Sequence, residues 1–101
     1  MISEILSTGR ENAKTGREIC TLLNITQRDL TSAVERERRA GKAICASTDS
    51  SNPGYYLAAD KEEMTAYCKS LYKRAGEIFK TRRECLKTLD ALPEREAAKN
   101  G

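Results

Sequence analysis

Four cysteines are the most chemically versatile side chains in this sequence, and their spacing limits what they can do. Cys20, Cys45, Cys68 and Cys85 lie far apart along the chain, and no two of them form a C-x-x-C pair. The sequence also has no histidine, whereas structural zinc is held by close pairs of Cys and His. We therefore expect no metal site, and four buried, reduced thiols that pack as small apolar residues.

Groups suited to catalysis are scarce. The absence of histidine removes the most common general base, and the sequence has neither a Gly-rich phosphate loop nor a G-x-S-x-G turn. We expect no enzymatic activity, no cofactor and no small-molecule ligand.

A second group of residues has the chemistry of nucleic-acid recognition. Arg can pair with guanine and Gln with adenine, while Thr and Ser hydroxyls reach phosphates or base edges. Such residues gather on the polar side of a helical pattern. Glu35 lies on the same side, and its negative charge opposes close approach of a phosphate unless it accepts a hydrogen bond from a cytosine amino group. The alternative is the ordinary solvated face of an amphipathic helix. The predicted DNA contacts are Lys14, Thr15, Gly16, Arg17, Thr26, Gln27, Arg28, Thr31, Ser32, Arg36, Arg39 and Lys42.

Charge and length alone do not identify a partner. The 101 residues suffice for one domain, and 18 basic against 15 acidic side chains leave a net charge of only +3. The case for DNA therefore depends on where the charges lie. The longest uncharged stretch, residues 50–59, is far too short to span a bilayer, and no signal-peptide pattern follows Met1. We expect a cytoplasmic protein without membrane contact.

Two closely spaced helix starts position the predicted contacts. Thr15 and Glu18 form a capping-box pattern, and Thr26 with Asp29 repeats it. Asn24 between them tolerates a left-handed turn. Two short helices joined by a tight turn predict a helix-turn-helix.

The surrounding elements complete one domain over residues 1–59. A short first helix is expected to end at Gly9, the second helix to bury Ile19, Leu22 and Leu23, and the third to end at Gly41. Strand-like runs at 43–47 and 55–58, separated by turn formers, predict a hairpin that packs on the helices. Three helices followed by a two-stranded hairpin make a winged helix, within a mainly α (α+β) fold.

The segments 15–19, 25–30, 34–44 and 54–58 carry a resemblance. They resemble the winged helix-turn-helix proteins of bacterial regulators and prophages, especially small prophage-encoded members. The resemblance covers residues 1–74 and implies double-stranded DNA binding. Glu37 departs from it, because such proteins usually place an apolar residue there.

A long helix is predicted over residues 60–92, ended by Pro93 and followed by a polar tail within 93–101. At 1.5 Å per residue it would be about 45 Å long, more than a core of about sixty residues can cover. Its apolar stripe therefore predicts a homodimer, with Arg82 as the one charged member. The predicted dimer interface is Leu71, Tyr72, Ala75, Ile78, Phe79, Arg82, Cys85, Leu86, Leu89 and Leu92.

Two functions fit this sequence. The first is sequence-specific DNA binding by a small dimeric transcriptional regulator or a prophage or mobile-element accessory factor. The second is a winged-helix protein-protein interaction module in a replication or packaging assembly. The small net charge favours it, as does the hairpin region, because residues 45–60 hold two Asp and no Lys or Arg.

Overall fold

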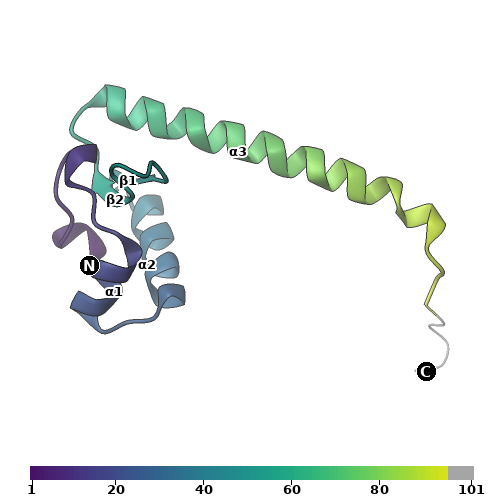
Figure 1. Ribbon diagram of the computed structural model, residues 1–101, viewed down its shortest axis with the longest axis horizontal. Coiled ribbons are helices and arrows are strands. Elements are labelled where there is room, and N and C mark those ends of the chain that lie inside the picture. The colour runs from purple at the N-terminus through teal and green to yellow at the C-terminus, as the bar shows by residue number, and fades with distance from the viewer. Residues whose placement is uncertain (96–101) are drawn as a thin grey trace. The chain divides into compact units, whose positions relative to one another are not determined.

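The computed structural model describes residues 1–95 and is mainly helical, with one two-stranded antiparallel sheet (Figure 1). It has two compact units, Met1–Lys69 and a second that begins at Ser70. In chain order, the elements are η1 (Ile2–Glu4), η2 (Arg10–Asn12), α1 (Gly16–Leu23), α2 (Gln27–Arg39), β1 (Ile44–Ser47), β2 (Gly54–Leu57), α3 (Lys61–Lys87) and η3 (Leu89–Ala91).

Both predicted capping boxes are present at the starts of α1 and α2. The Thr15 hydroxyl accepts from the Glu18 N–H at 3.1 Å, and the Thr26 hydroxyl accepts from the Asp29 N–H at 3.0 Å. Each acidic side chain in turn accepts from the N–H of its capping threonine. Between the helices, Asn24 adopts the left-handed conformation with φ 53° and ψ 52°. The two helix starts and the turn are therefore confirmed.

The first fourteen residues differ from the prediction. The expected first helix is only the 3-10 turn η1, and a second such turn, η2, follows directly after Gly9. The reason is a pairing with β2: the Leu57 N–H donates to the Ser7 carbonyl at 2.9 Å, and the Gly9 N–H donates to the Leu57 carbonyl at 2.8 Å. These bonds hold Gly9 in a non-helical conformation, with φ 96° and ψ 139°, so the helix cannot continue.

The predicted hairpin is present, with β1 and β2 paired from Ile44 opposite Leu57 to Ser47 opposite Gly54. The second edge of β2 is also occupied. The Tyr55 backbone N–H donates to the Lys14 carbonyl at 2.7 Å, and the Lys14 backbone N–H donates to the Tyr55 carbonyl at 2.9 Å. A two-stranded hairpin is marginal by itself, and these additional bonds tie it to the segment that leads into α1.

The main core is formed by Ile2, Leu6, Ile19, Leu30, Val34 and Ile44, all buried. As predicted, Ile19 and Ile44 belong to it, and Leu57 packs against it. The prediction for the end of α1 was wrong, because Leu22 is 65% exposed and Leu23 is 38% exposed. These two residues lie in the last turn of α1, at the edge of the core beside the Asn24 turn.

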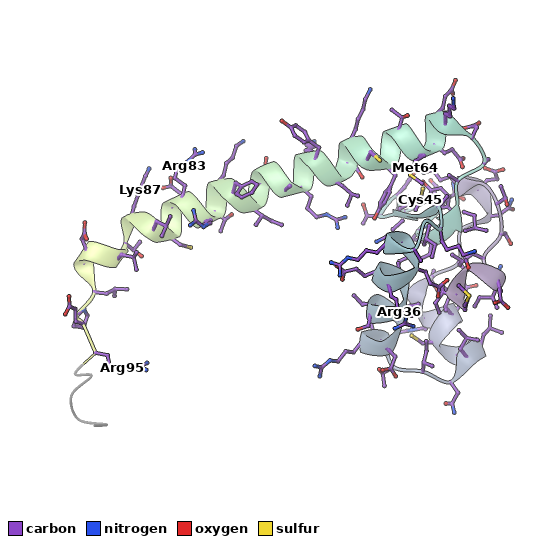
Figure 2. The ribbon with its side chains drawn as sticks, turned by 180° about the vertical axis from the view of Figure 1, so that it is seen from behind. Arg36, Cys45, Met64, Arg83, Lys87 and Arg95 are labelled. Atoms are coloured by element: carbon purple, nitrogen blue, oxygen red, sulfur yellow. The ribbon has the colours of Figure 1, made fainter. Side chains whose placement is uncertain are left out.

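A second apolar cluster joins the hairpin to the start of α3. Cys45, Tyr56 and Tyr67 are buried together, and Met64 packs against them. Figure 2 shows Met64 beside Cys45. The first compact unit therefore includes the beginning of α3, as far as Lys69.

The end of α3 and two of the thiols differ from expectation. The α-helix stops at Lys87 rather than continuing to Leu92, because the Thr88 N–H and hydroxyl both donate to the Cys85 carbonyl, at 3.1 and 2.7 Å, and the 3-10 turn η3 follows. All four cysteines are free thiols, but Cys68 and Cys85 are exposed and only Cys45 is buried, so burial was wrongly predicted for most of them.

Three further sequence expectations concern the polar tail, the membrane and metal binding. Of the expected polar tail, residues 96–101 lie outside the described residues. Within residues 1–95, no helix is both long enough and apolar enough to cross a membrane. In the same range, no group of three or more Cys, Asp or Glu side chains is arranged to hold a metal ion.

Candidate nucleic-acid interface

The outer face of α2 holds the polar side chains that sequence reasoning assigned to DNA. Leu30 and Val34 point into the core, so Arg28, Ser32 and Arg36 lie on the opposite side and are exposed. Within residues 1–95, these three side chains have no hydrogen bond or ion pair. Figure 2 labels Arg36 on this helix. Two cations and a hydroxyl on one helical face are therefore free to contact a ligand.

Other predicted contacts are occupied within the protein. The hydroxyls of Thr15 and Thr26 cap their helices, and the Thr31 hydroxyl donates to the Gln27 carbonyl at 3.0 Å. Arg39 forms an ion pair with Glu35 one turn earlier. These groups are therefore partly engaged within the protein, although the Thr31 hydroxyl can still accept and the Arg39 guanidinium keeps further N–H donors for a ligand.

The start of α1 and the start of α2 come together. The Gln27 amide packs against Gly16, where a Cβ atom would lie 3.0 Å from the Gln27 Oε1 atom. Arg17 is exposed beside them, and the Lys14 ammonium donates to the Ser7 hydroxyl at 3.1 Å. The first-turn N–H groups of Gly16 and Arg17 have no acceptor within α1. This corner thus combines a cation with backbone donors, which suits an anionic oxygen.

Lys42, the last predicted contact, is exposed just after α2. Its backbone N–H donates to the Glu37 carbonyl at 3.0 Å, while its ammonium has no partner within the described residues. The bond fixes the backbone at the base of the hairpin, so the free ammonium lies near the end of α2.

A basic residue that the sequence did not place at the hairpin lies there in the structure. Arg10 forms an ion pair of 2.9 Å with Asp49, at the start of the turn between β1 and β2. Asp49 also accepts from the Ser51 N–H at 3.0 Å, which orders the turn. Because Arg10 and Asp49 are 39 residues apart, no local pattern could have indicated the pair. The hairpin turn is therefore closer to neutral than its own residues suggest.

Arg38 is a second residue that sequence reasoning missed. Its Nε donates to the Ile44 carbonyl at 2.8 Å, and its guanidinium carbon lies 5.0 Å from the centre of the Tyr67 ring. Such a cation–π contact stabilises the position of the side chain. Arg38 also lines a hollow of about 360 Å³ between α2 and the sheet, together with Thr31, Arg39 and Tyr55. The residue thus fixes the second half of α2 against β1.

Glu37 is the buried acid that orients α2 from the other side. Only 4% of this residue is exposed, and its carboxylate accepts from the N–H groups of Ile2 at 2.7 Å and Ser3 at 2.9 Å. Burial acts to raise the pKa of Glu37, but the two backbone hydrogen bonds outweigh it and hold the pKa below its ordinary value. An ionised Glu37 therefore replaces the apolar residue that the sequence resemblance implies.

The second unit displays the apolar residues predicted to form a dimer interface. All of them are exposed except Ala75, which is half-buried, and the exposed fractions reach 84% for Tyr72 and 64% for Phe79. Leu89 and Leu92 lie in or after η3, beyond the end of the α-helix. The continuous helical part of the predicted stripe thus ends with Leu86.

Comparison with known proteins adds no relative. The chain matches no family model, no curated protein and no solved structure with which it was compared. The functional interpretation therefore depends on the residues of this chain.

Proposed function

We propose that the protein binds double-stranded DNA sequence-specifically, as a small dimeric transcriptional regulator or an accessory factor of a prophage or mobile element. In this proposal, residues 1–59 act as a winged helix-turn-helix. Helix α2 enters the major groove, and α1 crosses the phosphate backbone.

One observation carries this proposal: Arg28, Ser32 and Arg36 are exposed together on α2 without internal partners in residues 1–95. A recognition helix reads base edges from its first turns, which is where Arg28 and Ser32 lie. Arg can make two hydrogen bonds to guanine, and each such pair contributes about 1–3 kcal/mol of discrimination.

The corner formed by Lys14, Gly16 and Arg17 supports a second contact. Free N–H groups at the start of a helix, with a cation beside them, suit a phosphate oxygen. Phosphate contacts fix the position of a protein on the duplex without reading sequence. The hairpin contributes less, because Arg10 is already paired with Asp49.

The dimer is the second part of the proposal. The exposed apolar face of α3, with Ile78 at 61% and Phe79 at 64% exposure, is a large apolar area to leave in water. Burying it against a second copy would bring two recognition helices into one particle. A two-fold dimer of this kind binds a palindromic or repeated site.

The direct test is a titration of fluorescent duplexes at several salt concentrations, after selection of preferred sites from a random library. Counterion release predicts that the logarithm of the affinity falls linearly with the logarithm of salt, with a slope of about −0.9 per phosphate contacted. A single enriched motif together with this slope would support the proposal. Salt-insensitive binding, or no enrichment, contradicts it.

Matched arginine variants separate the interface from general charge. Arg28→Ala removes a free cation from α2, whereas Arg83→Ala removes an exposed cation from α3, outside the proposed interface (Figure 2). Both lower the net charge equally. A loss of affinity confined to Arg28→Ala indicates a specific contact, and equal losses indicate only nonspecific attraction.

A protein-binding role is the second candidate, and one observation favours it. A hollow of about 710 Å³ beside α2 is lined by apolar residues, among them Met1, Leu23, Ile25 and Ala33, and also by Ser32 and Arg36 of the proposed DNA-binding face. Met1 is 64% exposed and adds to its apolar character. If the chain shows no salt-sensitive retention on duplex DNA, this surface becomes the better candidate site, and the partner would be a protein.

A further inference from the structure

We propose that two copies of the chain pair antiparallel along α3, with Ala75 of each copy opposite Ile78 of the other. This inference rests on the dimer of the proposed function and specifies its geometry. The two-fold axis would then lie between the two helices, level with the peptide bond between Gly76 and Glu77.

The first argument is the spacing of mostly uncharged residues along α3. Steps of three and four place Cys68, Leu71, Ala75, Ile78, Arg82 and Cys85 along one seam of the helix, alternating between the a and d positions of a heptad. Ala75 and Arg82 are a positions, and Leu71 and Ile78 are d positions. In an antiparallel pair, each a residue meets a d residue of the other helix, whereas in a parallel pair each residue meets its own copy.

The charge of Arg82 favours the antiparallel arrangement over the parallel one. A parallel pair would place the two copies of Arg82 against each other at the centre of an a layer. The antiparallel register places Arg82 opposite Leu71, where its aliphatic stem packs on the leucine and the guanidinium extends to solvent. Like charges in direct contact are thereby avoided.

Side-chain size favours the same arrangement. In the parallel pair Ala75 would meet a second Ala75, which leaves a space, while Ile78 would meet a second Ile78. The antiparallel register pairs the small Ala75 with the large Ile78 in two neighbouring layers, so the seam is filled evenly.

The flanking residues provide a fourth argument. Tyr72 and Phe79 lie at e positions, and Arg74 lies at a g position of the same helix. A parallel pair brings e against g, so Phe79 would face Arg74 of the other copy. An antiparallel pair brings e against e, so Tyr72 of one copy meets Phe79 of the other. The two strongly exposed aromatic residues, 84% and 64% exposed, then cover each other on both sides of the axis.

The cysteines of α3 allow a direct test. Both are exposed free thiols, and the proposed register pairs Cys68 of one copy with Cys85 of the other. The full chain would carry Cys20→Ser in every sample, which leaves only the buried Cys45 besides these two. Diamide would be the oxidant, because it takes up the two electrons and two protons that two thiols release on forming a disulfide.

The informative samples are the single variants Cys68→Ser and Cys85→Ser, alone and mixed. Antiparallel pairing predicts little covalent dimer from either variant alone. The mixture should give at least ~10-fold more, all of it heterodimer joined through Cys68 and Cys85, because thiols held in contact react at a high effective concentration. Peptide mass spectrometry identifies the linked residues.

Efficient crosslinking of each single variant with itself would show parallel pairing and overturn the inference. A mixture that gives no heterodimer while sedimentation detects dimers would overturn it as well. Monomers in sedimentation would also overturn it, together with the dimer on which it rests. Duplex titration reads DNA binding separately, so a parallel dimer that binds DNA refutes only the orientation.

A distance measurement provides a second readout that needs no disulfide. A spin label at Lys87→Cys, an f position of the α3 heptad (labelled in Figure 2), would be attached with Cys20, Cys68 and Cys85 replaced by Ser. The proposed register separates the two labels by 21 helical positions, or about 32 Å along the axis at 1.5 Å per residue. A parallel pair would place the two labels at the same level, and so overturn the inference.

Discussion

The carboxylate of Glu37 in α2 accepts a 2.7 Å hydrogen bond from the backbone N–H of Ile2, 35 residues earlier in the chain. Its other oxygen accepts from the Ser3 N–H at 2.9 Å. The first turn of a helix leaves N–H groups without acceptors, and a buried charge needs partners. Each group therefore satisfies the other, and α2 is anchored to the start of the chain.

Glu37→Gln tests this anchor. The amide keeps the shape but loses the charge, and its NH₂ group faces a backbone N–H. Because hydrogen bonds to charged groups contribute about 1.5–3 kcal/mol, we expect a loss of that size in the free energy of unfolding at pH 7. Urea denaturation measures it. The exposed Glu35→Gln on the same helix is the control and should change stability far less.

The same residue predicts the response to acid. Since folding lowers the pKa of Glu37, its contribution is fully present above its ordinary value near pH 4.5 and is lost as the pH falls through the lower folded value. The stability difference between the unmutated protein and Glu37→Gln should therefore shrink below about pH 4.5. A difference that stays constant in that range would contradict the assignment.

Gly54→Ala should destabilise the first unit. Gly54 has a φ of +117°, and a Cβ there would overlap the Lys14 carbonyl. Backbone strain of this kind costs about 1–3 kcal/mol, before the lost pairing with Lys14 is counted. Thermal unfolding should show a lower midpoint, and an unchanged midpoint would mean that the pairing of Lys14 with Tyr55 is not formed.

Gly76→Ala should have the opposite effect. Gly76 lies inside α3, and within residues 1–95 no atom beyond its chain neighbours and the surrounding helix backbone lies within 4 Å of the position of an added Cβ. Alanine is the better helix former by about 1 kcal/mol, so helix content and stability should rise. A loss of stability would show that Gly76 has a close neighbour, for example in a dimer that places it inside the interface.

Arg28→Ala and Arg39→Ala should differ in DNA binding. If Arg28 reads a base, its loss should cost about 1–3 kcal/mol at the preferred site and relax the preference among sites. Arg39 lies near the end of α2 and is paired with Glu35, so its loss should weaken all duplexes slightly and alike. Titrations against the selected site and a scrambled duplex distinguish the two patterns. Equal and negligible effects would favour the protein-binding role.

Phe79→Glu with Leu86→Glu should abolish the proposed dimer. Burial of one large apolar side chain contributes about 1.5–3 kcal/mol, so charges at two such positions on each chain should prevent association. Light scattering at micromolar concentration should report a monomer. Titration of duplex DNA should show weaker binding. Lys80→Glu, on the outer face of the same helix, is the control and should remain dimeric. An unmutated protein that is itself monomeric contradicts the dimer.

Local patterns in the sequence were sufficient wherever the interacting groups are close along the chain. The capping boxes at Thr15 and Thr26 join residues three positions apart, and the left-handed turn depends on Asn24 alone. The starts of α1 and α2, the hairpin and the long C-terminal helix follow from such patterns. The polar outer face of α2 also follows, because it lies opposite the buried Leu30 and Val34.

Only the tertiary structure decided what distant residues do to one another. Burial of an acid at Glu37 depends on donors at Ile2 and Ser3, and the non-helical backbone at Gly9 depends on pairing with Leu57. The helical periodicity at Leu22 indicates an apolar face of α1, but it does not indicate whether another element covers that face. The burial and the backbone conformation of these residues are set by partners many positions away in the sequence. A local pattern does not encode such partners.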